Sequence, residues 1–475
     1  MVDRPAGAWQ DQLGWALLVL AAMAGAVAVG WIGFIASDDS LYHAGAAEWL
    51  ARPPFAGSDH WTTRFPLVVT FAGMIALLGD GFGAFAATAL LFYVLLVGTM
   101  GVFGRSLGGA RVGWLAALLT ATLPVVVTQA TTVGVDLPEA SLLLAGVILL
   151  TQTGRRPAHA FTAGMCFGLA MLCRETTALP LLGLVPLFFL GRPIPRELII
   201  AAGVGTLAML GAEALFQGLV TGDPLRRYAI AFNHDSTIDR AANLEGNLLV
   251  HPAINSLLVL LINNDFGLLF WAAAAALVAG AHRSIEASAR PRAIVLTAMA
   301  GASFLLVSVL ATKLVLNPRY FLLPALTAVL FVALWLDRLP ALSRRLLLTP
   351  TIALNLLLLS ASNAHPRWPM EVLVAAARAH QTEIVHGDAN DVARARLPLR
   401  LAGGGRIDAR PAPVGALLVA PADRAPPGLV LARYPSPPTR LGVLIRTLGV
   451  HPLLPAPIER RLLRPNPTML LLRAG

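Results

Sequence analysis

Charged side chains are scarce in this chain of 475 residues. Asp, Glu, Lys and Arg make up 13% of it, whereas a soluble globular domain carries about 25%. Hydrophobic residues make up 56%, and the mean hydropathy is +0.70. The composition excludes an ordinary soluble protein and predicts a polytopic membrane protein. The first apolar segment is too long for the core of a signal peptide and lacks a small-residue cleavage site, so we expect it to be an uncleaved span.

Cysteine is also scarce, because the chain contains only Cys166 and Cys173. Both lie on one apolar segment, and a helix would place them about two turns apart, which is too far for a disulfide bond. We interpret them as helix-packing residues. Nowhere in the sequence do Cys and His residues have the spacing of a structural zinc site.

The basic residues give a formal net charge of +10, and nearly all of them are arginine. Nucleic-acid binding requires basic residues clustered on one face. Here the arginines are scattered between apolar segments, so we expect no nucleic-acid partner. This distribution is typical of residues that orient membrane spans.

The long apolar segments predict about eleven transmembrane helices. A helix needs about 20 apolar residues to cross the hydrocarbon core of a bilayer. The stretch 66–79 is apolar but short, so we interpret it as an interfacial or re-entrant helix. The expected spans are 13–36, 83–104, 112–133, 137–152, 158–173, 177–191, 198–220, 254–281, 293–312, 318–336 and 346–362.

The arginines between these spans predict the orientation. With the N-terminus in the cytoplasm, every inside connection holds at least two arginines, and most acidic residues fall outside. Counting 66–79 as a span would reverse the later segments and place arginine pairs outside. We therefore expect a multi-pass protein of the bacterial inner (plasma) membrane, with a cytoplasmic N-terminus and a periplasmic C-terminus.

The composition divides the chain after residue 362. Residues 1–362 form the predicted membrane domain, whose first outer loop (37–82) carries interfacial helices. Residues 363–475 are rich in Pro, Arg and Gly and contain no possible span. Their pattern predicts a small α/β domain on the outer face. Its expected elements are a helix over Met370–His380 and strands at Glu383–His386, Ala416–Ala420, Gly428–Ala432 and Met469–Leu472.

Polar motifs gather at the outer ends of the predicted spans. Acidic side chains there can act as a general base, and arginine suits a phosphate because its planar fork donates two charge-assisted hydrogen bonds. Each motif taken alone also fits a solvated loop or an interfacial anchor. The motifs are Asp38-Asp39 with Tyr42, His60 with Arg64, Asp136 with Glu139, Arg174-Glu175, and Lys313 with Arg319-Tyr320.

Together these motifs resemble those of the GT-C glycosyltransferases, in the dolichyl-phosphate-mannose protein mannosyltransferase group (glycosyltransferase family 39), which includes bacterial aminoarabinose transferase-like enzymes. The resemblance covers roughly residues 13–340. It rests on Asp38-Asp39 with Tyr42, Asp136-x-Pro138, Gly168-Leu169-Ala170 before Arg174-Glu175, and Arg319-Tyr320-Phe321-Leu322-Leu323-Pro324. The tail is not covered.

The resemblance implies an all-α, GT-C-like enzyme that takes a sugar from a polyprenyl phosphate and inverts the anomeric centre. Asp38 corresponds to the leading acidic residue and is the implied general base, with Asp39 as the alternative. Arg174 stands where relatives often have Lys. The segment from His60 to Pro66, which contains Arg64, departs from a more usual His-Pro-Pro element.

The remaining motif residues divide between donor and acceptor in this interpretation. Arg174, Lys313, Arg319 and Tyr320 are expected to bind the donor phosphate. Tyr42, His60, Arg64, Asp136, Glu139 and Glu175 are expected to bind substrate. Asp136 and Glu139 could instead hold a divalent cation, and no other cofactor is expected.

The acceptor is left open among lipid, glycan and protein, and membrane lipids are the other expected partners. The competing hypothesis is a secondary transporter, whose carboxylates should lie near the bilayer midplane in repeated, broken helices. In this sequence the carboxylates lie at span ends, and no repeat is visible. A non-catalytic envelope-assembly protein is the third possibility, but it leaves the acidic and arginine motifs unexplained.

Overall fold

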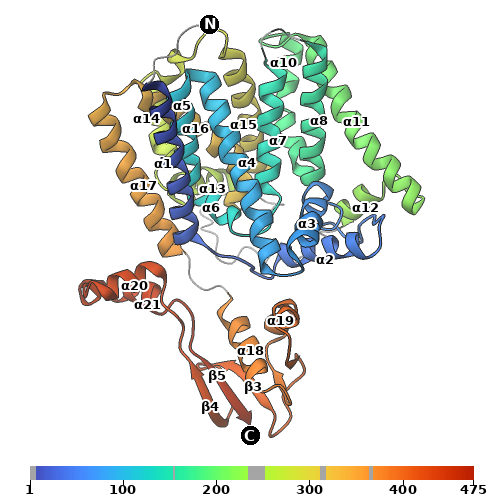
Figure 1. The fold of residues 1–475 in the computed structure, drawn as a ribbon, viewed down its shortest axis with the longest axis vertical. Helices are drawn as coiled ribbons and strands as arrows, with labels where there is room; N and C mark the ends of the chain where they lie inside the picture. Colours follow the sequence, from blue (N-terminus) through green and yellow to red (C-terminus); the bar gives the residue numbers. More distant parts are fainter. Residues whose placement is uncertain (1–6, 153, 155, 234–251, 311–316, 363–366) are drawn as a thin grey trace.

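The computed structural model describes residues 7–152, 154, 156–233, 252–310, 317–362 and 367–475. A bundle of helices forms the upper part of the molecule in Figure 1, and a small mixed α/β region follows it in the chain and lies at one end of the bundle. The elements of the bundle, with η for a short 3₁₀ helix, are α1 (Gly7–Gly30), α2 (Asp38–Ala51), α3 (Phe65–Leu78), α4 (Phe82–Gly108), α5 (Ala110–Thr122), α6 (Pro124–Ala130), α7 (Asp136–Leu150), α8 (Pro157–Cys173), η1 (Glu175–Thr177), α9 (Ala178–Leu181), α10 (Leu184–Leu190), α11 (Arg196–Thr221), α12 (Arg226–Asn233), α13 (Pro252–Ile262), α14 (Leu269–Val278), η4 (Ala281–Ser284), α15 (Arg290–Leu310), η5 (Pro318–Phe321), α16 (Leu322–Arg338) and α17 (Ala341–Ser362).

Within the described residues, six helices are long and apolar enough to cross a membrane, or seven if the bent pair α5–α6 is one span. These six are α1, α4, α11, α15, η5–α16 and α17. The chain is therefore a mostly helical protein with several membrane-spanning helices. The predicted number of eleven is not confirmed, because the other predicted spans are shorter or broken.

Three predicted spans are interrupted for local reasons. The span 112–133 bends by 65° between α5 and α6, because Pro124 disfavours a helical conformation at Leu123. The span 254–281 is two helices, α13 and α14, separated by a turn at residues 263–268. In that turn the carbonyl of Asp265 accepts a hydrogen bond from the N–H of Val125 (2.9 Å). The span 177–191 is divided among η1, α9 and α10.

The shorter helices α7 and α8 pack inside the bundle. Helix α8 runs along both α7 and the long α11. Glycines allow the backbones of α8 and α11 to touch, since a Cβ atom on Gly164 would lie 1.8 Å from the carbonyl oxygen of Ala202. Such close contact between small residues is a common way for membrane helices to associate. The most buried long helix is α16, which packs against α5, α14 and α15.

The tail region contains a five-stranded sheet in the order β2-β1-β3-β5-β4. Strand β1 pairs in parallel with β2 and β3, whereas β5 pairs antiparallel with β3 and β4. The predicted helix and four predicted strands are present with shifted ends, and β2, α19 and the last two helices were not predicted. The tail elements are α18 (Trp368–Ala379), β1 (Ile384–His386), α19 (Ala389–Ala402), β2 (Arg406–Asp408), β3 (Leu417–Pro421), β4 (Gly428–Tyr434), α20 (Arg440–Thr447), η6 (His451–Leu453), α21 (Ala456–Leu463) and β5 (Met469–Ala474).

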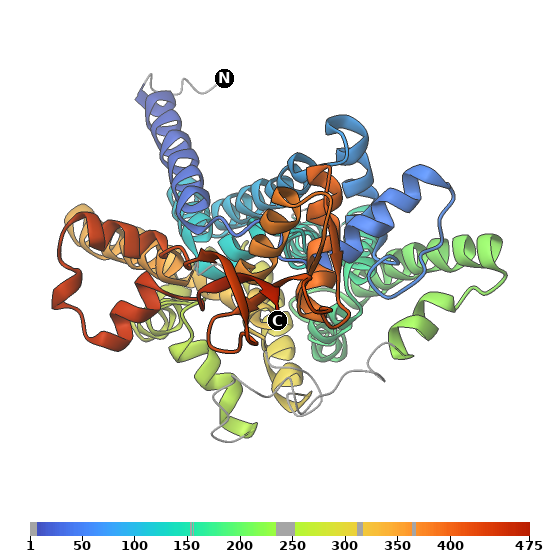
Figure 2. The same ribbon diagram turned by 90° about the horizontal axis from the view of Figure 1, so that it is seen from below.

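The tail lies next to the end of the bundle that carries α2 and α3 (Figures 1 and 2). Two contacts join the regions there. The Arg367 guanidinium donates to the carbonyl oxygen of Phe34, and Arg400 of α19 lies 3.6 Å from Asp80, between α3 and α4. The tail therefore contacts the segment between α1 and α2, which leads directly into the acidic pair at the start of α2.

Candidate active site

The two aspartates at the start of α2 have different surroundings. Asp39 is buried, and its carboxylate accepts three backbone N–H groups, from Ile35 (2.7 Å), Ser37 (2.8 Å) and Ser40 (3.0 Å). Burial raises the pKa of Asp39, although these three hydrogen bonds oppose the rise. Asp39 therefore holds the turn between α1 and α2 in place, and its oxygens are already occupied.

Asp38 is the more accessible acid of the pair. Its side chain is 29% exposed, and its Oδ2 lies 3.4 Å from Nη1 of Arg319. Arg319 is in η5, where the Asn317 side chain accepts the Arg319 backbone N–H at 3.1 Å. A carboxylate from the first predicted outer loop thus meets an arginine at the start of α16.

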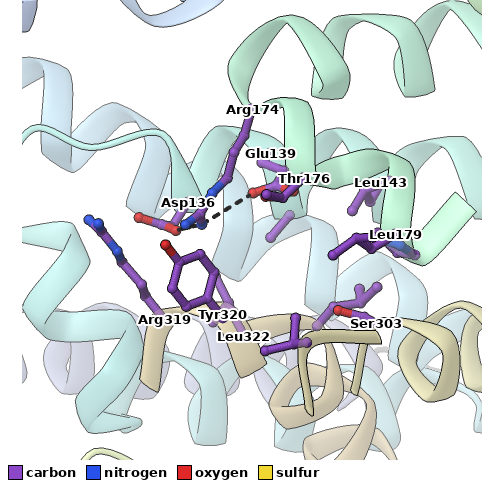
Figure 3. Close-up of a pocket in the computed structure, with 14 residues that line it drawn as sticks. Asp136, Glu139, Leu143, Arg174, Thr176, Leu179, Ser303, Arg319, Tyr320 and Leu322 are labelled. Atoms are coloured by element: carbon purple, nitrogen blue, oxygen red, sulfur yellow. Dashed lines mark hydrogen bonds and ion pairs between the residues drawn. The ribbon is translucent and has the colours of Figure 1, made fainter. Parts of the chain in front are cut away.

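Arg174 lies at the centre of a second, more buried ion cluster (Figure 3). Its Nη1 is 2.5 Å from Asp136 Oδ1 and 3.9 Å from Glu139 Oε2. Its guanidinium also stacks on the Tyr320 ring, 4.3 Å from the ring centre, within the range of a cation–π contact. Glu139 in turn accepts the Thr177 hydroxyl at 2.6 Å. The cluster therefore connects α7 to η5 through Arg174 and to η1 through Glu139.

These side chains line one cavity. Arg174, Arg319 and Tyr320 form its polar wall with Asp136 and Glu139. The opposite wall is mostly apolar, and Figure 3 shows Leu143 and Leu179 on that side with Ser303 below them. The cavity is small, about 40 Å³. It has space for about one or two water molecules.

Tyr42, His60 and Arg64 form a third group close to Asp38. One terminal nitrogen of Arg64 donates to the Tyr42 hydroxyl, and the other lies 2.5 Å from His60 Nε2. Tyr42 is fully buried one helical turn after Asp38. Burial raises the pKa of Tyr42 well above its ordinary value, so its hydroxyl keeps its proton at neutral pH.

Glu175 is paired with Arg227, a residue that the motif analysis missed. The Arg227 side chain is fully buried; one nitrogen donates to the Thr63 carbonyl, and another to the Leu172 carbonyl (3.1 Å) and to Glu175 (2.7 Å). Burial alone would raise the pKa of Glu175, but the Arg227 guanidinium holds it below its ordinary value. The adjacent pair Arg226-Arg227 in a predicted outer loop, where the orientation rule disfavours arginine pairs, was the signal that could have identified it.

His43, one residue after Tyr42, is also buried. Its Nε2 lies 2.6 Å from Asp80 Oδ1, and its ring stacks on Phe85 with 5.2 Å between ring centres. Because Asp80 also pairs with Arg400 of the tail, His43 connects the helix that carries Asp38 to α19. These contacts give His43 a structural role.

Two of the predicted site features have no counterpart within the described residues. Lys313 lies outside the described residues. Among the described residues, no group of three or more His, Cys, Asp or Glu side chains could hold a metal ion. In addition, Arg174 already occupies the Asp136 oxygen that a cation would need, so Asp136 and Glu139 fit a divalent ion poorly in this arrangement.

No protein-family model matches this chain, and no curated protein matches its sequence. Solved structures do match its fold. ArnT from Cupriavidus metallidurans bound to undecaprenyl phosphate aligns with a TM-score of 0.61 at 16% identity, covering 88% of this chain and 96% of ArnT. The apo form of the same protein gives a TM-score of 0.60.

A second similar structure is the Archaeoglobus fulgidus oligosaccharyltransferase AglB in complex with an inhibitory peptide and a dolichol-phosphate. It aligns with a TM-score of 0.51 at 14% identity, covering 82% of this chain and 64% of AglB. Both proteins are GT-C glycosyltransferases. This chain therefore has a GT-C-like fold, as its motifs predicted.

Proposed function

We propose that this chain is a membrane glycosyltransferase that moves a sugar from a polyprenyl phosphate to an acceptor at the outer face of the bacterial inner membrane. The observation that carries the proposal is the meeting of Asp38 and Arg319 (3.4 Å) beside the cavity that Arg174 and Tyr320 line. In the proposed mechanism Asp38 acts as the base and Arg319 binds the phosphate. The similarity to ArnT, one of whose structures holds undecaprenyl phosphate, supports the same function.

Arg319 is the proposed contact for the donor phosphate. Its side chain is 32% exposed, and its ion pair with Asp38 is long, so the guanidinium can approach a further anion. It also lies in the short helix that leads into the N-terminus of α16, where the helix dipole favours negative charge. Because the cavity is so small, a sugar phosphate would bind at its mouth, beside Arg319.

Arg174 has a different proposed role. Its charge is already neutralised by Asp136 at 2.5 Å, and its side chain is 9% exposed. We infer that it orients Asp136 and the Tyr320 ring, and adds to the positive field at the phosphate without being the main contact. Removal of Arg174 should therefore affect folding, whereas removal of Arg319 should affect donor binding.

Asp38 is the proposed general base, because the oxygens of Asp39 are held by backbone N–H groups. The acceptor hydroxyl gives its proton to Asp38, and its oxygen bonds to the anomeric carbon. The bond between that carbon and the phosphate oxygen breaks, and its electron pair leaves on the phosphate, where Arg319 stabilises the new charge. A single displacement of this kind inverts the anomeric centre. A positioned base contributes about a hundred- to ten-thousand-fold in rate.

The remaining predicted residues form the proposed acceptor side. Tyr42 lies one turn along α2 from Asp38. Arg64 links Tyr42 to His60. Glu139 and Glu175 are held by Thr177 and Arg227. No step of this mechanism passes through a metal ion.

We also propose the topology and domain division that the sequence predicts: eleven membrane crossings, a cytoplasmic N-terminus, a membrane domain of residues 1–362 and a periplasmic domain of residues 363–475. The packing of α7 and α8 alongside the long α11 supports counting short helices as crossings. The tail and the Asp38 loop lie at the same end of the bundle, as a shared outer face requires.

The function can be tested in cells with and without this protein. Mass spectrometry of the lipid and glycoprotein fractions of the envelope should reveal an acceptor that lacks one sugar residue when the protein is absent. The polyprenyl phosphate carrying that sugar should accumulate in the same cells. Identical profiles in both strains, under conditions in which the protein is expressed, would contradict a transferase function.

A further inference from the structure

Two short tail helices form a hairpin that extends away from the sheet. The tail hairpin, residues 440–464, comprises α20, η6 and α21. It is a packed unit: the backbone and hydroxyl of Thr439 both donate to the Leu462 carbonyl, at 2.8 and 3.1 Å. A Cβ atom on Gly442 would lie 2.2 Å from the same oxygen, so the two helices are in direct backbone contact. The hairpin is therefore a defined part of the fold.

One side of the hairpin exposes large apolar side chains. Leu441, Leu444 and Ile445 of α20 recur at helical spacing with Leu448, the residue that caps the helix. The same spacing puts Arg446 on the other side of α20. A domain surrounded by water seldom exposes so many large apolar residues together. On this side Leu444 and Leu448 are exposed, and Val443 is exposed on the side of Arg446. Elsewhere in the hairpin the exposed apolar residues are Val450, Leu453 and Ile458.

The hairpin is also strongly basic. Its only acidic residue is Glu459. Arginines beside an apolar surface favour an anionic membrane, because their stems can lie along apolar chains while the guanidinium reaches lipid phosphates. The arginines of the hairpin are Arg440, Arg446, Arg460, Arg461 and Arg464.

The position of the hairpin indicates what covers its apolar side. Helix α20 contacts α17, and Figure 1 shows α20 and α21 below the lower end of α17. Helix α17 is one of the six candidate spans and has few buried residues. It exposes Leu342, Leu346 and Leu357, which a bilayer would cover. Helix α20 therefore lies against a helix whose outer surface faces lipid.

We propose that the tail hairpin lies in the outer interface of the bilayer, with its leucines among the upper acyl chains and its arginines on anionic lipid phosphates. Helices with this pattern bind in the plane of the membrane. The hairpin would hold the tail against the membrane beside α17. This proposal needs only a membrane-spanning bundle and does not depend on the transferase activity.

Spin labels can measure the depth of the hairpin in the full-length protein. Single cysteines at Leu444, Leu448 and Arg446 would be labelled in a background with Cys166 and Cys173 replaced by alanine. The protein would be placed, one copy per disc, in nanodiscs of phosphatidylcholine and phosphatidylglycerol. Relaxation by oxygen and by a water-soluble nickel complex then reports depth. Labels at Leu444 and Leu448 should be shielded from nickel, and the label at Arg446 should not.

Two control positions calibrate the result. A label at Leu357 of α17 gives the value for lipid, and a label at the exposed loop residue Val414 gives the value for water. Nickel access at Leu444 and Leu448 equal to that at Val414 would overturn the proposal. Shielding that needs two copies in a disc would also overturn it, because the hairpin would then be a protein interface. Omitting phosphatidylglycerol removes the anionic lipid, so nickel access at Leu444 and Leu448 should rise towards the value at Val414.

Discussion

Replacing Arg319 by alanine tests the proposed phosphate contact. A charge-assisted hydrogen bond contributes about 1.5–3 kcal/mol, and the lower value is appropriate because the Arg319 side chain is one-third exposed. At about 1.4 kcal/mol for each factor of ten, Arg319→Ala should bind undecaprenyl phosphate roughly tenfold more weakly. Arg319→Lys keeps the charge but loses the planar fork, so its affinity for undecaprenyl phosphate should lie between those of Arg319→Ala and the unmodified protein.

The assay is a titration of the purified protein, in nanodiscs, with undecaprenyl phosphate. The matched control is Arg338→Ala, which removes the same charge from the opposite end of α16, where Arg338 donates to the Gly280 carbonyl at 2.8 Å. Arg338→Ala should bind the lipid like the unmodified protein. Equal affinities for Arg319→Ala and the unmodified protein would mean that Arg319 is only an interfacial anchor.

Two further predictions concern the buried contacts of Asp39 and Arg174, and a third concerns the topology. Asp39→Asn should lower stability by about 1–3 kcal/mol, because an amide cannot accept all three backbone N–H groups; an unchanged melting temperature would refute this structural role. Arg174→Ala leaves Asp136 buried without its cation and should lower the free energy of unfolding by about 3–5 kcal/mol. Thermal unfolding of Arg174→Ala and of the control Arg338→Ala measures this loss. Equal losses of stability in the two variants would contradict the structural role of Arg174. An alkaline phosphatase fused after Asn363 should be active, and an inactive fusion with an active cytosolic reporter at the same point would reverse the topology.

Much of the architecture could be predicted from the sequence, since hydropathy and charge act along the chain. The apolar segments at 83–104, 198–220 and 293–312 correspond to α4, α11 and α15. The tail strands could be predicted because each is a short apolar run bounded by Pro, Gly or charged residues. Helix α19 was missed, since Pro398 lies inside it and proline ordinarily interrupts a helix.

The partners within the site could not be predicted, because they come from distant segments. Asp38 and Arg319 are 281 positions apart in the chain, and Arg227 reaches Glu175 across the bundle. The sequence also could not decide between Asp38 and Asp39, because the difference depends on the backbone geometry of the preceding turn. There, Ala36 adopts a positive φ of 55°, and three N–H groups point at Asp39.

The most direct test of the proposed transferase is the Asp38→Asn variant in the envelope assay. Asparagine keeps the size of the side chain but removes the basic carboxylate. Among the described residues, the three backbone N–H groups of the preceding turn and Ser40 bind Asp39 and not Asp38. At equal expression and equal melting temperature, the variant should fail to restore the sugar to the acceptor, and the sugar-loaded polyprenyl phosphate should accumulate. Full restoration of the acceptor by Asp38→Asn would contradict the proposed catalytic mechanism.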